Sequence, residues 1–417
     1  MKEHNFIVEN HLNGTPVDLV VGIPSFNEAD SIGFVVEQVA KGLQEFFPHL
    51  NTAIINADNS SEDGTKHAFL ASESADIPKV YLSTDQGVRG KGNNLYNLFH
   101  YLSFYKPKVT VVVDADLHSI RPDWVYCLAQ PIMHGYDFVT PIYTRNEYDG
   151  TITNHLCYPL LYGLLGKNVR QPIGGDFSFS NQMMNHWRLL EWGSNVRQYG
   201  ADIFLTAEAL LGGFEVAQVV LGSKVHKSTS PQMGEVFLQV VDTLFRRLLE
   251  SKDDWEEVAS GTETPPVHRC TRNLDPPQSL SIDYKGLKRQ ASEEFDVHRD
   301  LVLEILPCKM AKQVLEMFRA QRFRVSSSMW AKIVCYFICS YDRAGDRSGR
   351  MQVVRALKSL YFARVISFIR ATLELDYVES EKRILRQAQV FRSHRSAMIK
   401  KIHSQVSVVD HSSHRVA

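Results

Sequence analysis

Short apolar runs alternate with amphipathic segments over the first half of the chain, and this alternation predicts an α/β domain. Runs rich in β-branched residues occupy 17–23, 53–56, 80–83, 109–113 and 138–143. Apolar positions recur at helical spacing in other segments, as in 32–46 and 201–211. Strands that alternate with helices are typical of a mostly parallel sheet covered by helices. We therefore expect an α/β fold.

The pattern changes in the second half of the chain, where proline pairs interrupt it and longer helical periodicity follows. Pro265 and Pro266, and then Pro276 and Pro277, indicate irregular chain. Helical spacing then dominates, with a break expected at Pro307. The predicted division is an N-terminal tail (1–16), the α/β domain (17–255), an irregular linker (256–294), a helical region (295–403) and a mobile tail (404–417).

Composition narrows the class of protein. The 417 residues are 44% hydrophobic and 22% charged, as in globular proteins, and the net charge of -1 gives no general excess of cations for binding nucleic acid. No apolar run approaches the roughly 20 residues of a membrane-spanning helix, and polar residues within 1–13 argue against a secretion signal. The six cysteines form no Cys-x-x-Cys pair. We expect a cytoplasmic protein without nucleic-acid partners.

An acidic pair follows the apolar run 109–113. Asp114 and Asp116 flank Ala115, and because side chains alternate along an extended segment, both carboxylates should point to the same side. Hard oxygen ligands suit Mg²⁺ or Mn²⁺, which could bridge the phosphates of a nucleotide sugar. The alternative is an ordinary turn in which the two acids cap the following segment.

Polar motifs also follow the other predicted strands. Pro24, Phe26 and Glu28 follow the first run, and Asp58 with Asn59 follows the second. Because ligands of open α/β sheets bind beyond the carboxyl ends of the strands, these residues should meet in one crevice. The same motifs could also be simple turns.

Six motifs together resemble a known family. The segments 22–28, 58–65, 89–92, 114–116, 171–176 and 221–226 occur in the order found in retaining GT-A glycosyltransferases. Over 17–249 the chain resembles glucosyl-3-phosphoglycerate synthases and, more distantly, mannosylglycerate synthases. The resemblance implies a GT-A fold, Rossmann-like and mostly parallel, with a helical C-terminal extension. It also implies a divalent metal and a nucleotide-sugar donor.

The resemblance and the strand-end positions together assign roles to individual residues. Nucleotide-sugar contacts are expected from Pro24, Phe26, Glu28, Asp58, Asn59, Lys91, Asp114 and Ala115. The metal is expected at Asp116 and His226, supported by Asp114. The acceptor is expected at Arg145, Gly174, Gly175, Lys227 and Ser228, although the family has Arg-Asn where this chain has Lys227-Ser228. Asp176, which stands where the family has Glu, and Asp202 are expected beside the reacting sugar.

These assignments predict transfer of a hexose, glucose first, with retention at the anomeric carbon. The expected donor is of the UDP-glucose or GDP-mannose type, the acceptor is 3-phosphoglycerate or glycerate, the metal is Mg²⁺ or Mn²⁺, and a homodimer is one expected assembly. Two other enzymes stay open. An inverting GT-A enzyme that makes a polysaccharide or glycolipid could use Asp202 as general base, and a nucleotidyltransferase could use the same acids to make a sugar nucleotide. A scaffold without activity is a third alternative.

Overall fold

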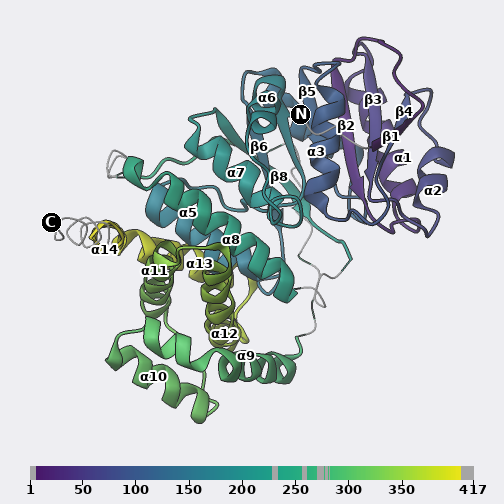
Figure 1. Cartoon of the computed structure of the whole chain (residues 1–417). Helices are drawn as coiled ribbons and strands as arrows, with labels where there is room; N and C mark the ends of the chain where they lie inside the picture. Colours follow the sequence, from purple (N-terminus) through teal and green to yellow (C-terminus); the bar gives the residue numbers. More distant parts are fainter. Residues whose placement is uncertain are drawn as a thin grey trace. The chain divides into compact units, whose positions relative to one another are not determined.

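A computed structural model describes residues 6–227, 233–255, 261–269, 277, 280 and 282–404 (Figure 1). Its contacts divide the chain into two compact units. The first, called the sheet unit, comprises 1–145, 170–232 and 265–278. The second, called the helical unit, comprises 146–169, 233–264 and 279–417. The two units are therefore interleaved along the sequence.

The sheet unit is built on one nine-stranded sheet with the order β1-β4-β3-β2-β5-β7-β6-β8-β9. Most neighbouring strands are parallel, whereas β1 is antiparallel to β4 and β7 is antiparallel to both β5 and β6. The strands are β1 (Phe6–Glu9), β2 (Leu19–Ser25), β3 (Thr52–Asp58), β4 (Lys79–Thr84), β5 (Val109–Val112), β6 (Phe138–Thr144), β7 (Phe177–Ser180), β8 (Val216–Ser223) and β9 (Val267–Arg269).

Strand register brings polar residues to one edge of this sheet. Ser25 at the end of β2 lies opposite Asp58 at the end of β3. Gly22 of β2 lies opposite Val112, the last residue of β5, so Asp114 follows only two residues later. The apolar runs of β2 and β5 are wholly buried because helices cover the sheet. The parallel register therefore fixes where the polar residues after these strands emerge.

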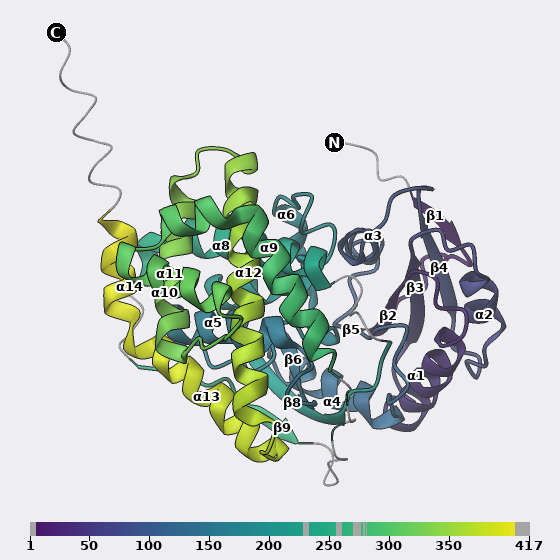
Figure 2. The same cartoon turned by 90° about the horizontal axis from the view of Figure 1, so that it is seen from below.

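Helices cover both faces of the sheet, and Figure 2 shows α1 and α3 on opposite sides of β2 and β3. A Cβ atom on Gly22 would approach Leu98 of α3 to 2.4 Å, and one on Gly42 of α1 would approach the Pro122 carbonyl of α4 to 2.3 Å. Glycine therefore permits close packing at both contacts. The helices of this unit are α1 (Ile32–Phe46), α2 (Thr65–Ala71), α3 (Lys91–Leu102), α4 (Pro122–Met133), α6 (Asn181–Leu189) and α7 (Ala201–Leu211).

The helical unit contains no strand of the nine-stranded sheet among its described residues. A π-helical turn (Thr153–Cys157) leads directly into α5. Gly163 of α5 packs so closely on α13 that a Cβ atom there would lie 2.8 Å from Phe391. The α-helices are α5 (Tyr158–Leu165), α8 (Met233–Glu250), α9 (Tyr284–Ile305), α10 (Cys308–Arg319), α11 (Ser327–Arg343), α12 (Arg347–Thr372), α13 (Tyr377–Ser393) and α14 (Arg395–His403).

The structure confirms the mostly parallel α/β sheet and the predicted break at Pro307, which caps α10. Two local expectations were wrong. The expected tail 1–16 contributes β1, which pairs with β4, and α9 begins at Tyr284, inside the expected irregular linker. The predicted boundaries of whole domains stay a prediction, and residues 405–417 lie outside the described residues. None of the described helices combines the length and apolarity needed to cross a membrane.

Candidate functional site

The loops after β2 and β3 are locked together by Asp58. Its carboxylate accepts hydrogen bonds from Ser25 Oγ at 2.6 Å, Ser61 N at 2.7 Å and Tyr81 Oη at 2.9 Å. Asp58 is fully buried. A buried carboxylate with this many donors has little capacity left for a ligand, so its contacts support a role in positioning the two loops.

The loop after β2 presents Phe26 and Glu28. The Arg89 guanidinium lies 4.6 Å from the Phe26 ring centroid, a cation–π distance. The Glu28 backbone N–H donates to Thr65 Oγ1 at 2.8 Å, which holds this loop against the start of α2. Asn59 lies buried on the neighbouring loop, and its backbone N–H donates to the Ser25 carbonyl at 3.2 Å. Pro24 is a buried residue within β2.

Two lysines and two aspartates form a central charge cluster at the carboxyl ends of the strands. Lys91, the first residue of α3, donates to Asp114 Oδ1 at 2.7 Å. Lys224, just after β8, donates to Asp114 Oδ2 at 2.8 Å and to Asp176 Oδ2 at 2.9 Å. Asp176 Oδ1 in turn accepts from the backbone N–H of Asp114 at 2.7 Å. Both oxygens of Asp114 are thus ion-paired.

The ion pairs of the cluster keep Lys91, Lys224 and Asp114 charged. Burial by itself lowers the pKa of Lys91, but the charges of Asp114 and Asp202 outweigh burial and hold that pKa above its usual value. Burial is likewise outweighed for Lys224, whose pKa is raised by Asp114 and Asp176. Burial would raise the pKa of Asp114, but Lys224 and Lys91 hold it well below its usual range. The ammonium groups and the Asp114 carboxylate therefore stabilise one another.

The paired glycines Gly174 and Gly175 complete this cluster through their carbonyls. Gly175 O accepts from Lys91 at 2.9 Å, and Gly174 O accepts from Lys224 at 2.9 Å. Gly175 has a φ of 91°, and a Cβ atom there would lie 2.3 Å from Asp114 Oδ2. Only glycine fits this position without displacing the carboxylate. Whether the pair also contacts an acceptor stays a prediction.

Asp116 lies beside the cluster next to His226 and Lys227. Its Oδ2 accepts from the backbone N–H of Lys227 at 3.1 Å. Burial and the Asp114 charge raise the pKa of Asp116, and the charges of Lys224 and His226 only partly oppose them. His226 Nδ1 lies 2.8 Å from the Lys227 carbonyl. Asp116 is thus a half-buried carboxylate whose ionised form another cation would stabilise.

The donor types around Asp116 fit a divalent metal. Within the part of the chain that the structure describes, no three His, Cys, Asp or Glu side chains converge as a complete metal cage. Mg²⁺ sites that act on phosphates commonly use one or two protein carboxylates and take their other ligands from the substrate and water. Asp116 offers one such carboxylate and His226 beside it offers a ring nitrogen, whereas Asp114 already binds both lysines.

Asp202 and Arg145 lie at the border of the cluster. Asp202 Oδ2 accepts from Lys91 at 3.3 Å, while its buried Oδ1 has no hydrogen-bond partner among the described residues. Burial raises the pKa of Asp202, with Lys91 opposing it. The Arg145 guanidinium lies 5.8 Å from the Tyr143 ring centroid. Tyr143 Oη donates to Asp176, so Arg145 lies near the cluster.

The structure thus brings together most of the residues predicted for the site. The Lys227 ammonium pairs with Glu28 at 2.6 Å and with Asp30 at 2.7 Å, and its predicted contact with an acceptor stays a prediction. Ser228 lies outside the described residues. Lys224 was missed by sequence reasoning. Its position directly after a strand and two residues before His226 was the available signal, but a lone lysine is usually a solvated residue.

Comparison with known proteins finds matches over part of the chain. Residues 20–186 match the model of Glycosyl transferase family 2. Glucosyl-3-phosphoglycerate synthase of Petrotoga mobilis is 29% identical over 164 residues, which are 38% of this chain and 43% of that protein. The matched region thus spans less than half of the length of this curated relative.

Solved structures of glucosyl-3-phosphoglycerate synthase from Mycobacterium tuberculosis are also similar. One is a complex with Mn²⁺, UDP and phosphoglyceric acid, with 26% identity, a TM-score of 0.45, and coverage of 55% of this chain and 78% of that chain. Another, with Mg²⁺ and UDP, has 26% identity, a TM-score of 0.45 and coverage of 55% and 79%. The sheet unit thus has a GT-A-like fold, residues 20–186 resemble Glycosyl transferase family 2, and the chain is similar over part of its length to glucosyl-3-phosphoglycerate synthases.

Proposed function

We propose that this protein transfers a hexose, with glucose as the first expectation, from a nucleoside diphosphate sugar to 3-phosphoglycerate or glycerate with retention. The central support is the buried Lys91 ammonium, which lies between Asp114 and Asp202 at the carboxyl ends of the strands. Displacement of a nucleoside diphosphate creates negative charge on the leaving group. A preorganised, permanently charged lysine stabilises such charge with little reorganisation.

The residues around Lys91 have separate roles in the proposed reaction. Asp116 and His226 would hold Mg²⁺ or Mn²⁺, which when bound supplies positive charge to the diphosphate. Phe26 and Arg89 offer a flat, cationic surface to the nucleoside. Lys224 holds Asp114 and Asp176 in place, so that neither turns toward the diphosphate as an uncompensated anion. Arg145 is the cation proposed for an acidic acceptor.

Asp202 favours one rival function. Its raised pKa and its unpartnered Oδ1 are properties that a general base needs, and an inverting transfer would use such a base. In the retaining reaction that we favour, the leaving phosphate takes the acceptor's proton instead, and no side chain acts as nucleophile. The anomeric configuration of the product, measured by NMR, separates the two reactions.

The test is a panel of sugar nucleotides offered with 3-phosphoglycerate or glycerate, in Mg²⁺, Mn²⁺ or EDTA. We expect nucleotide release and a product whose mass equals acceptor plus hexose, with loss of activity in EDTA. Asp116→Asn should lower kcat/KM by about 10²-fold or more, because one lost electrostatic contact of this kind costs about 2.7–4 kcal/mol. Asp296→Asn on the exposed face of α9 makes the same chemical change away from the site and serves as the control.

Two results would count against the proposal. Full activity of Asp116→Asn in EDTA would remove the metal from the mechanism. Release of pyrophosphate instead of a nucleoside diphosphate would identify a nucleotidyltransferase.

A further inference from the structure

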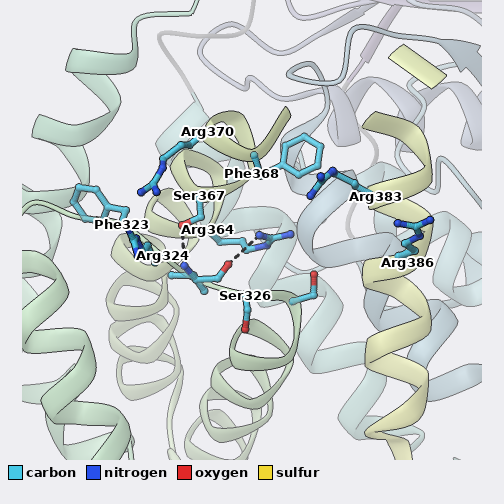
Figure 3. A pocket seen from close by; sticks show the side chains of 12 residues that line it. Phe323, Arg324, Ser326, Arg364, Ser367, Phe368, Arg370, Arg383 and Arg386 are labelled. Atoms are coloured by element: carbon cyan, nitrogen blue, oxygen red, sulfur yellow. Dashed lines mark hydrogen bonds between the residues drawn. The ribbon is translucent and has the colours of Figure 1, made fainter. Parts of the chain in front are cut away.

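The helical unit contains a cavity that is lined by five arginines and by no acidic residue. Its volume is about 540 Å³, and it lies among the segment before α11, the second half of α12 and the middle of α13 (Figure 3). Figure 3 shows Arg364 in the centre, with side chains of α13 on one side and those near α10 on the other. The arginines are Arg324, Arg364, Arg370, Arg383 and Arg386.

Arg364 is the most buried of these cations, with 7% of its surface exposed. Its Nε donates to Gln387 Oε1 at 2.7 Å and its Nη1 donates to the Val325 carbonyl at 3.0 Å. Both acceptors are neutral, and burial lowers the pKa of Arg364 to about 10. A buried guanidinium without a carboxylate partner is unfavourable by itself, because no opposite charge compensates for its lost hydration.

The other four arginines are exposed at the rim and lack acidic partners within the described chain. Elsewhere in the same unit arginines do find such partners: Arg246 pairs with Glu250 at 2.9 Å, and Arg299 pairs with Asp296 at 2.9 Å. The cavity therefore gathers cations where the fold has placed no carboxylate. Like charges in one concave surface repel each other and raise the local positive potential, which attracts anions.

Neutral groups at the cavity suit the same kind of ligand. α11 begins at Ser327, so the positive end of its helix dipole opens at the cavity wall. Ser367 Oγ accepts from the Val325 N–H at 2.9 Å, which fixes the wall beside Arg364. Phe368, 2% exposed, lies with its ring centroid 5.9 Å from the Arg364 guanidinium carbon and gives the cavity an apolar base.

We propose that this cavity binds a small phosphorylated metabolite that carries two or more negative charges. Arginine forks match phosphate oxygens in pairs, and the cavity volume lies in the range of small-molecule sites, about 300–1,000 Å³. The site is open to solvent on one side, but its arginines come from three segments and surround one hollow, which favours a compact ligand over an extended surface such as a membrane or a nucleic acid. The cavity residues all belong to the helical unit, whereas the residues of the candidate active site belong to the sheet unit. The proposal therefore does not rest on the proposed function.

The test is isothermal titration calorimetry of the full chain with inorganic pyrophosphate in EDTA and low salt. The test variant is Arg383→Gln with Arg386→Gln, because both side chains are exposed and their loss should leave the fold intact. The control is Arg319→Gln with Arg355→Gln, which removes the same charge from exposed positions of the same unit that do not line the cavity. Lys91→Met removes the cation of the candidate active site, so a loss of pyrophosphate binding in this variant would show that pyrophosphate binds at that site.

We expect the test variant to bind pyrophosphate about tenfold or more weakly, because it loses two donors of charge-assisted hydrogen bonds. The Arg319/Arg355 control should bind as the wild type does, and Lys91→Met should retain the binding that depends on Arg383 and Arg386. Equal binding by the test variant and the wild type, or loss of binding in Lys91→Met, would overturn the proposal.

A second arm uses vesicles that contain phosphatidylserine. Absence of cosedimentation supports the small-molecule assignment. Sedimentation that depends on Arg383 and Arg386, together with no pyrophosphate binding, would assign the surface to membranes and overturn the proposal.

Discussion

Lys224 provides the sharpest test of the central charge cluster. Replacing Lys224 by Met keeps a chain of similar length but removes an ammonium whose side chain is 2% exposed. Asp114 retains Lys91, whereas Asp176, with a side chain that is 0% exposed, loses its ion pair. Removing one partner of a buried ion pair typically costs about 3–5 kcal/mol, because the remaining charge is buried without compensation. We expect the sheet unit of Lys224→Met to lose stability by about this amount.

A matched control makes the magnitude interpretable. Lys108 pairs with Asp18 at 3.1 Å, but its side chain is 80% exposed. The same Lys→Met change there should cost about 0–1 kcal/mol, the usual range for an exposed pair. Urea unfolding followed by tryptophan fluorescence measures both variants. Trp124 reports on this region, because its ring centroid lies 5.4 Å from that of Tyr143, the residue that donates to Asp176.

The pH dependence gives an independent check, and its sign follows from the pKa of Asp114. In the wild type that pKa is lowered, so its contribution to stability is complete above the usual value of 3.8 and is lost as the pH falls through the lower folded value. In Lys224→Met, Asp114 keeps only Lys91, so burial opposes its ionised form more strongly and the folded state takes up a proton more readily. Acidification from pH 7 to about pH 5 should therefore narrow the stability gap between variant and wild type. A gap that is constant with pH, or no larger than that of Lys108→Met, would refute the reasoning.

Two further predictions concern single positions. Gly175→Ala should lower activity and should destabilise the sheet unit by more than the about 1–2 kcal/mol of backbone strain that a positive φ imposes. Gly213 has a φ of 71° but open space around it, so Gly213→Ala should show the backbone strain alone in the same urea titration. In a Cys270→Ser background, a thiol reagent should label Cys308 in the native protein, because the Cys308 side chain is exposed. The reagent should label Cys157 only after unfolding, because Cys157 is buried and burial raises its pKa. Native labelling of Cys157 would contradict the buried position of α5.

The two lysines of the cluster also explain why its acids can lie so close together. Asp114 and Asp176 share Lys224, and Asp114 and Asp202 share Lys91. Without these cations the carboxylates would repel one another and some would take up protons. The cluster can therefore hold a preformed shape before any ligand binds, which is the condition for electrostatic stabilisation of a leaving group.

The sequence by itself determined the parts of this protein that depend on local pattern. Alternating strand and helix patterns predicted the sheet, because the spacing of apolar residues and the runs of β-branched residues indicate which side chains are buried. The positions of Asp114, Asp116 and Lys91 at the boundaries of strands and helices placed them at one edge, because parallel strands share their direction. Pro307 predicted the break between α9 and α10, because proline cannot continue a helix.

Only the tertiary structure decided which charges meet. Lys224 and Asp114 are 110 residues apart, and their ion pair follows from the order of strands, in which antiparallel β7 lies between β5 and β6. No local pattern predicts that insertion. The same holds for the arginine cavity, because Arg324, Arg364 and Arg386 lie on three separate segments of the chain. Charge pairing depends on distance in space, and helix packing sets that distance between residues that the sequence keeps far apart.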